Sequence, residues 1–168
     1  ANIVAPPPPP PPVTITRIYD IQGAAHVSPL VGQSVTTTGI VTAVDTNGFY
    51  LQDATGDGNI ATSDAIFVFT SSAPAVQVGQ EVNVSGTVSE FTPGGSSTGN
   101  LSITQISGSP TITVLSSNNP LPAAVVLGVD RSPPTEVIDD DDFASFDPTV
   151  EGIDFFESLE GMLVTVKD

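Results

Sequence analysis

From Thr14 onward, short runs of β-branched and aromatic residues alternate with turns rich in Gly, Asn and Asp. Apolar residues at every second position indicate a half-buried strand, and Val82, Val84 and Val88 follow this pattern. Such runs predict strands at Ser34–Asp45, Gly48–Asp53, Ala65–Ser71, Glu81–Phe91 and Leu101–Ile106, the last continuing after Pro110 as Thr111–Leu115. Five short strands predict an all-β fold, a small barrel or a sandwich.

Ile66 to Phe69 are apolar on both faces of their strand. This favours a central strand, or one that turns an aromatic side chain toward a ligand.

One motif occurs twice along the chain. Val31-Gly32-Gln33, followed by Gly39 and Val41, recurs 47 residues later as Val78-Gly79-Gln80, followed by Gly86 and Val88. In each copy a tight turn is followed by a long strand, and the glycine within the strand favours a bulge or a sharp bend. A weaker third copy, Leu159-Glu160-Gly161 followed by Val164-Thr165, lies near the end of the sequence and could open another β-domain or pair with this one.

The two ends of the sequence differ from its centre. Residues 1–13 form a Pro-rich linker, in which Pro6 to Pro12 predict a polyproline II rod. Residues 14–120 are assigned to the β-barrel. Residues 121–168 are expected to wrap around the barrel. They contain a Pro133-Pro134 break and the acidic run Asp139 to Asp142. A short helix is predicted at Gly152–Leu159, with Ile153, Phe156 and Leu159 on one side. The sequence begins with Ala and ends in a strand-like run, so we expect a piece of a larger protein.

The chain of 168 residues has 3 Lys and Arg against 19 Asp and Glu, a net charge of −16. This excludes an independent nucleic-acid binder of the usual kind, because such affinity comes mainly from cations that neutralise phosphates. A hydrophobic content of 39% predicts a folded chain. There is no Cys and no apolar stretch near the ~20 residues of a membrane helix, so neither a disulfide framework nor a helical membrane anchor is expected.

The segment from Asp53 to Asp64 fits a twelve-residue calcium loop. The ligands fall at Asp53, Thr55, Asp57, Asn59 and Asp64, Gly58 permits the sharp turn, and the apolar Ile60 is expected to pack inward. Thr at the third position and Asp at the twelfth depart from the pattern, and the flanks are strands. We therefore expect a weak calcium site in a β context, with a polar hairpin as the alternative.

Other candidate residues give weaker signals. Five aromatic residues on the predicted strands, Phe49, Tyr50, Phe67, Phe69 and Phe91, could offer stacking faces to bases or sugars, and the alternative is that they belong to the core. We select Phe49, Tyr50 and Phe67 as the nucleic-acid contacts. The run Asp139 to Asp142 is a second cation site or, more simply, a solvated loop. His26 has no partner in recognisable spacing and is interpreted as a loop histidine. No adjacent nucleophile and base can be named, so this segment is not expected to be an enzyme.

Several runs resemble the OB-fold-like domain of secreted bacterial nucleases that carry a downstream endonuclease/exonuclease/phosphatase domain. The first of these are Tyr19-Asp20-Ile21-Gln22-Gly23, Ser28-Pro29-Leu30-Val31-Gly32-Gln33, Gly39-Ile40-Val41-Thr42-Ala43-Val44 and Gly48-Phe49-Tyr50-Leu51-Gln52-Asp53, and others follow to Phe155–Met162. The resemblance implies a five-stranded OB-like barrel. The space between Ser71 and Glu81 is too short for the helix that commonly joins the third and fourth OB strands.

The resemblance also implies an exported, metal-dependent phosphodiesterase whose catalytic residues lie in a separate domain. Under this interpretation the chain is a monomeric, extracellular accessory module that positions single-stranded nucleic acid or the catalytic domain of the same chain, without membrane contact. The alternative is a calcium-stabilised spacer or glycan-binding module with no nucleic-acid contact.

Overall fold

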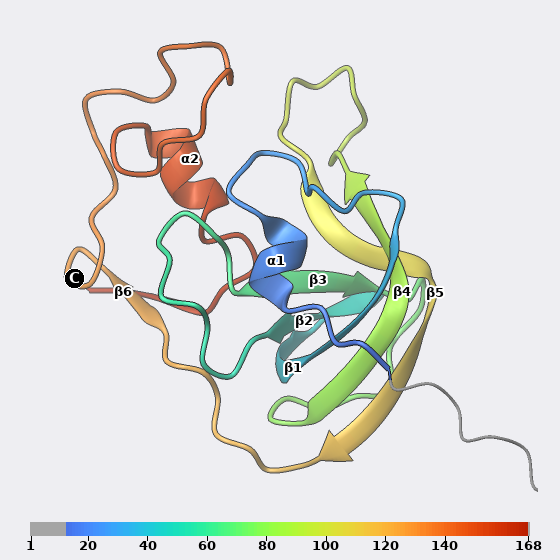
Figure 1. Cartoon of the computed structure of the whole chain (residues 1–168). Helices are drawn as coiled ribbons and strands as arrows, with labels where there is room; N and C mark the ends of the chain where they lie inside the picture. The colour runs from blue at the N-terminus through green and yellow to red at the C-terminus, as the bar shows by residue number, and fades with distance from the viewer. Residues whose placement is uncertain (1–12, 168) are drawn as a thin grey trace, which may run out of the picture.

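Five strands close into a barrel, as the alternating pattern predicts. We describe a computed structural model, which covers residues 13–167 and so leaves nearly all of the predicted Pro-rich linker outside the described residues. The strands are β1 (Ser34–Val44), β2 (Gly48–Gln52), β3 (Ala65–Phe69), β4 (Glu81–Phe91) and β5 (Ile103–Ser116), joined in the order β1-β2-β3-β5-β4 (Figure 1). Only the β3–β5 pair is parallel within this barrel. The predicted all-β fold with a five-stranded barrel is confirmed.

Alternation along the strands sorts side chains between the core and the outer surface. Val82, Val84 and Val88 are fully buried, as predicted. Phe49 and Leu51 of β2 and Ile66 and Val68 of β3 also point inward and join the same core cluster. The residues between them therefore project from the outside of the barrel.

The repeated motif forms a pair of equivalent turns that bond to each other's strands. Gly32 donates its N–H to the carbonyl of Val88, and Gly79 donates to the carbonyl of Val41, each at 2.9 Å. The glycines have φ of 81° and 82°, a conformation that favours glycine. Because β1 and β4 also pair antiparallel, the two copies make an approximate two-fold unit within the barrel.

The bulge predicted from the mid-strand glycines is found in one of the two copies: β5 has extra residues opposite Gly86, whereas Gly39 pairs in regular register with Val82. The β4–β5 register shifts between Ser85 and Thr87, and a Cβ at Gly86 would lie 2.6 Å from Ile106 Cγ2. The same irregularity explains why Pro110 does not interrupt β5. Ser107 and Thr111 have partners on β4, whereas the residues between them, Pro110 included, lie in the irregular stretch where no ladder donor is required.

The helix α1 (Ile18–Gln22) precedes the barrel and was not predicted. It buries Ile18 and Ile21 in the core cluster and packs against β3 and β1 (Figure 1). Residues 71–80, between β3 and β4, hold turns and no helix, as expected.

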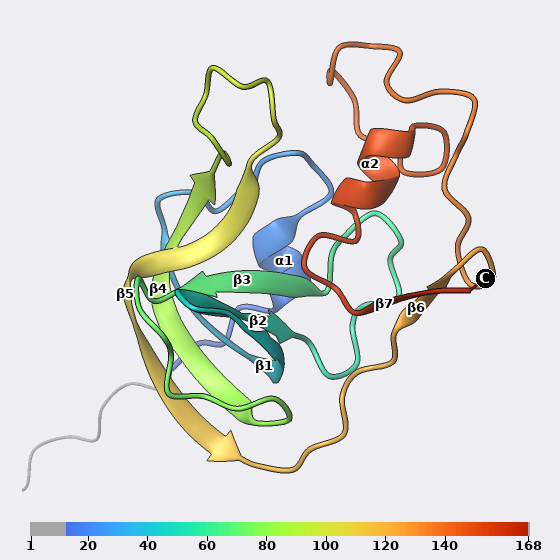
Figure 2. The same ribbon diagram turned by 180° about the vertical axis from the view of Figure 1, so that it is seen from behind.

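The C-terminal segment runs along one side of the barrel. It contains β6 (Val125–Leu127), α2 (Gly152–Glu157) and β7 (Val164–Val166), and β6 and β7 form a separate parallel pair (Figure 2). The third copy of the motif therefore pairs with β6 and not with the barrel. The helix was predicted at the right place, but its buried residues include Phe155, whereas Phe156 is 56% exposed, so the predicted apolar face was wrong at Phe156. None of the described helices has the length and apolar character to cross a membrane.

Candidate functional site

An apolar cleft of about 360 Å³ opens on the outer surface of β2, β3 and the start of β5. Its walls combine four aromatic rings and an aliphatic side chain with polar groups, namely Tyr50, Phe67, Phe69, Phe91, Ile103, Asp45, Asn47 and Gln105. The turn between β1 and β2 supplies Asp45 and Asn47, while the strand ends beside the β4–β5 loop supply Phe91 and Ile103.

Strand pairing places the aromatic rings together. Tyr50 and Phe67 are direct partners in the β2–β3 ladder, and their ring centroids lie 5.0 Å apart with a tilt of 57°. Gly48 lies two residues before Tyr50 on the same face of β2, and a Cβ there would lie 2.3 Å from Cζ of Phe67. The glycine therefore leaves the space that the Phe67 ring occupies.

The polar groups of the cleft carry no positive charge. Its one ionisable acid is Asp45, whose carboxylate accepts a hydrogen bond from the Thr46 N–H at 2.6 Å. The side-chain amide of Gln105 donates to Ser89 at 3.3 Å. Cations are held elsewhere: Arg17 pairs with Asp53, and the Arg131 guanidinium lies 4.7 Å from the centre of the Phe155 ring. The cleft can thus bind rings by stacking and uncharged polar groups by hydrogen bonds.

Two of the three predicted stacking residues lie in the cleft. Tyr50 and Phe67 are half-buried there, whereas Phe49 is completely buried in the barrel core and cannot meet a ligand. The assignment of Phe49 was wrong because neighbouring residues of a strand face opposite sides. Phe69 and Phe91, which the sequence also offers as stacking faces, complete the cleft.

The predicted calcium loop, Asp53 to Asp64, is organised at its start around an arginine. Arg17 Nε and Nη2 donate to the two carboxylate oxygens of Asp53 at 2.8 and 2.6 Å, and Nη2 also reaches Thr55 Oγ1 at 3.3 Å. Burial raises the pKa of Asp53, but hydrogen bonds from the Thr55 and Gly56 amides and from Arg17 outweigh it and leave the pKa lowered. A guanidinium therefore neutralises this carboxylate.

The other predicted ligands of this loop bond mainly to its own backbone. Asp57 accepts from the Asn59 N–H at 2.8 Å, and Asp64 accepts from the Asp57 N–H at 3.3 Å. In the described part of the chain, this loop brings no three carboxylate oxygens within 4.8 Å of one another. Ile60 is 48% exposed, so its expected inward packing was wrong. Calcium at Asp53, Thr55, Asp57, Asn59 and Asp64 stays a prediction.

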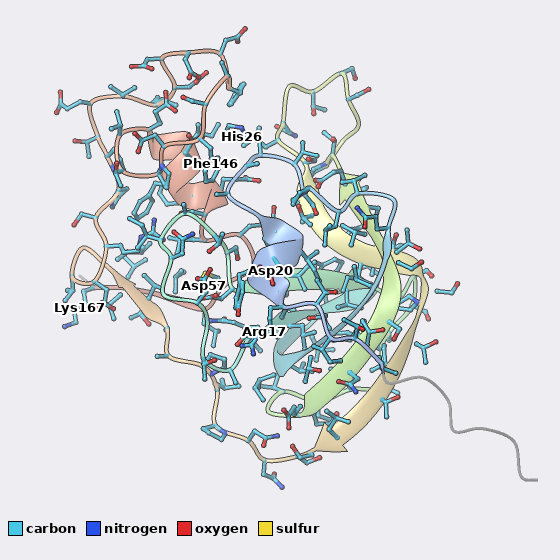
Figure 3. The ribbon with its side chains drawn as sticks, in the orientation of Figure 1. Arg17, Asp20, His26, Asp57, Phe146 and Lys167 are labelled. Carbon is cyan, nitrogen blue, oxygen red and sulfur yellow. The ribbon has the colours of Figure 1, made fainter. Side chains whose placement is uncertain are left out.

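His26 lies in a loop, as predicted, and links two distant segments. Its Nε2 lies 2.6 Å from Asp154 Oδ1 of α2, and its ring meets those of Phe143 and Phe146 edge-on at 5.3 and 5.1 Å. Figure 3 shows His26 beside Phe146 where the loop after α1 approaches the C-terminal segment; it also labels Arg17 and Asp57. This contact fastens the C-terminal segment to the barrel.

Comparison with known proteins gives a match for only part of the chain. Residues 126–168 match the model of a domain of unknown function, DUF8508. The matched stretch starts in β6 and includes α2 and β7, and it leaves the five barrel strands outside. No curated protein and no solved structure matches the chain.

Proposed function

We propose that this chain is a non-catalytic, OB-like accessory module of an extracellular metal-dependent nuclease, and that its aromatic cleft stacks the bases of single-stranded nucleic acid. The observation that carries the proposal is the cleft itself. OB-like barrels bind oligonucleotides and oligosaccharides on the face of their second and third strands, beside the β1–β2 and β4–β5 loops. The cleft of Tyr50, Phe67, Phe69 and Phe91 occupies that face.

The chemistry of the cleft suits bases better than phosphates. Stacking on aromatic side chains contributes about 1–3 kcal/mol per base and needs no charge. The net charge of −16 repels the phosphate backbone, and the residues that line the cleft include an acid and no base. We therefore infer that contact is made through the bases, with phosphates turned to solvent and screened by cations.

A glycan-binding module is the second candidate, and the same absence of basic side chains favours it. An uncharged sugar ring stacks on aromatic faces and meets no repulsion from the acidic surface. Asp45, Asn47 and Gln105 at the cleft offer hydrogen-bonding groups of the kind that recognise hydroxyls.

The two candidates predict different responses to salt when a short oligothymidylate and a neutral chito-oligosaccharide are titrated into the protein. Binding driven by phosphate contacts weakens as salt rises. Here we expect oligothymidylate affinity to rise with salt or calcium, because screening reduces repulsion, while sugar affinity is unaffected. NMR shifts of the Tyr50 and Phe67 rings measure both interactions. If neither probe shifts these rings at any salt concentration, the cleft is not a binding site for either class.

Substitutions in the cleft test the stacking contribution. Phe67→Ala is expected to weaken binding of the responding probe by about 5-fold to 100-fold, the range given by loss of one stacking face. Tyr50→Phe keeps the ring and is expected to stay within about 3-fold of the parent affinity, as befits a contact made by the aromatic face. Equal losses in the two variants would contradict the stacking model. A thermal melt of each variant checks that the barrel remains folded.

A further inference from the structure

A loop in the C-terminal segment is closed on itself at a narrow neck. Val137 and Glu151 form an isolated β-bridge, and the Gly152 and Ile153 amides donate to the carbonyls of Val137 and Ile138 at 2.9 and 3.1 Å. The loop between the two sides, residues 139–150, begins with the acidic run Asp139 to Asp142. The backbone contacts therefore hold the start and the end of this loop together.

Three carboxylates converge at the neck. Asp139, Asp141 and Glu151 each present an oxygen, and these oxygens lie within 4.8 Å of one another. Calcium–oxygen distances of about 2.3–2.6 Å allow two ligands of one ion to be separated by up to about 5 Å. The spacing of the three carboxylates therefore matches that of ligands around a single calcium ion.

Glu151 supplies an independent sign that a ligand belongs there. Its side chain is only 3% exposed, its Oε1 accepts the Asp140 N–H at 2.9 Å, and its Oε2 is buried without a hydrogen-bond partner. A buried carboxylate oxygen without a partner is unfavourable and uncommon in folded proteins. A cation that binds Glu151 through this oxygen would satisfy it.

We propose that Asp139, Asp141 and Glu151 form a calcium site that closes this loop. A cluster of carboxylate oxygens at a loop suits calcium, which accepts irregular oxygen coordination, better than magnesium, which demands near-ideal octahedral geometry. The site is separate from the loop at Asp53 to Asp64, where Arg17 already neutralises Asp53.

The ion would also connect the loop to the barrel. Phe143 and Phe146 belong to the same loop and hold the ring of His26, which lies between α1 and β1. Fixing the neck of the loop would restrict both phenylalanines. Calcium therefore stabilises the docking of the C-terminal segment, and the ion binds the folded chain in preference to the unfolded one.

Calorimetric titration of calcium chloride into the whole, chelator-treated chain tests the site. We expect saturable binding with Kd of about 10⁻⁴–10⁻³ M, and a rise in melting temperature of roughly 5 °C when calcium is present well above Kd. Asp139→Asn and Glu151→Gln are expected to weaken this binding at least about 10-fold, since each removes a charged ligand. Asp142→Asn removes the same charge from the same acidic run but lies outside the cluster, so its affinity should stay within about 2-fold.

Two results would overturn the proposal. If Asp142→Asn weakens binding as much as Asp139→Asn does, the run attracts calcium diffusely and forms no site. If calcium binding survives Asp139→Asn but is lost in Asp57→Asn, the ion occupies the loop at Asp53 to Asp64. Because Asp139 is partly exposed, its asparagine variant is expected to fold even if Glu151→Gln does not. Neither result bears on the aromatic cleft, so this proposal and the proposed function can fail independently.

Discussion

The free energy of unfolding is expected to fall by several kcal/mol between about pH 5 and pH 8.5, because two carboxyl groups must ionise in an unfavourable place. Burial, together with the charge of Glu90, raises the pKa of Glu160 to about 7, although hydrogen bonds from Gln22 and Thr104 oppose the shift. Burial and the charges of Glu160, Glu90 and Asp154 raise the pKa of Glu157 to about 8. Both groups lie where the C-terminal segment meets the barrel.

The direction of the effect follows from the raised pKa values. In the unfolded chain these carboxyls ionise near their usual pKa of about 4.3, while in the folded chain they keep their protons to higher pH. The stabilisation is therefore complete below the unfolded pKa and is lost as pH rises through about 7 for Glu160 and about 8 for Glu157. For Glu160 alone, a shift of this size corresponds to about 3 kcal/mol.

Glu160→Gln isolates this contribution. The amide keeps an acceptor for the Thr104 N–H, which Oε1 of Glu160 accepts at 3.1 Å, but carries no ionisable proton. Denaturant melts should show similar stability for the variant and the parent near pH 5, and a variant more stable by about 3 kcal/mol near pH 8.5. Glu136→Gln, at an exposed position, is the matched control and should follow the parent curve. Parallel curves for all three proteins would contradict the assignment.

The alternation of apolar and polar residues predicted most of the barrel strands from the sequence alone. The bounds of β4 agree with the prediction at both ends, because apolar residues at alternate positions meet turn residues on either side. The interruption predicted at Pro110 was wrong for a reason that is visible only in the strand pairing, since the proline is one of the extra β5 residues opposite Gly86. The helix α1 has five residues, too few to show a helical period, so only its packing reveals it.

The residues behind the predicted pH dependence and the proposed calcium site were less predictable, because contacts between distant parts of the sequence bring them together. Glu160 is partly buried and contacts Thr104, 56 positions away, and Gln22, 138 positions away, and composition gives no sign of either contact. The convergence of Asp139 and Glu151 likewise depends on the bridge at Val137. By contrast, Tyr50 and Phe67 could be selected from the sequence, since aromatic residues on central strands are natural candidates for stacking.

Phe49 was also selected from the sequence as a stacking residue, but it lies in the core. Substitution of Phe49 should therefore lower stability much more than substitution of Phe67. Phe49 is fully buried in the core cluster, whereas Phe67 lies partly exposed in the cleft. Phe49→Ala is expected to lower the free energy of unfolding by about 3–5 kcal/mol, through lost burial and the cavity left behind. The melting temperature should drop by roughly 10 °C or more.

Phe67→Ala is the matched variant, because it removes the same side chain from the adjacent strand but from the opposite face. It should cost about 1 kcal/mol of stability, since its ring is only partly removed from water. Denaturant melts and the titrations of the cleft, made on both variants, then separate the two roles. Phe67→Ala loses ligand affinity and keeps the fold, whereas Phe49→Ala, under conditions where it remains folded, keeps the affinity. If Phe49→Ala lost ligand affinity and kept its stability while Phe67→Ala unfolded, the assignment of Phe49 to the core and Phe67 to the cleft would be contradicted.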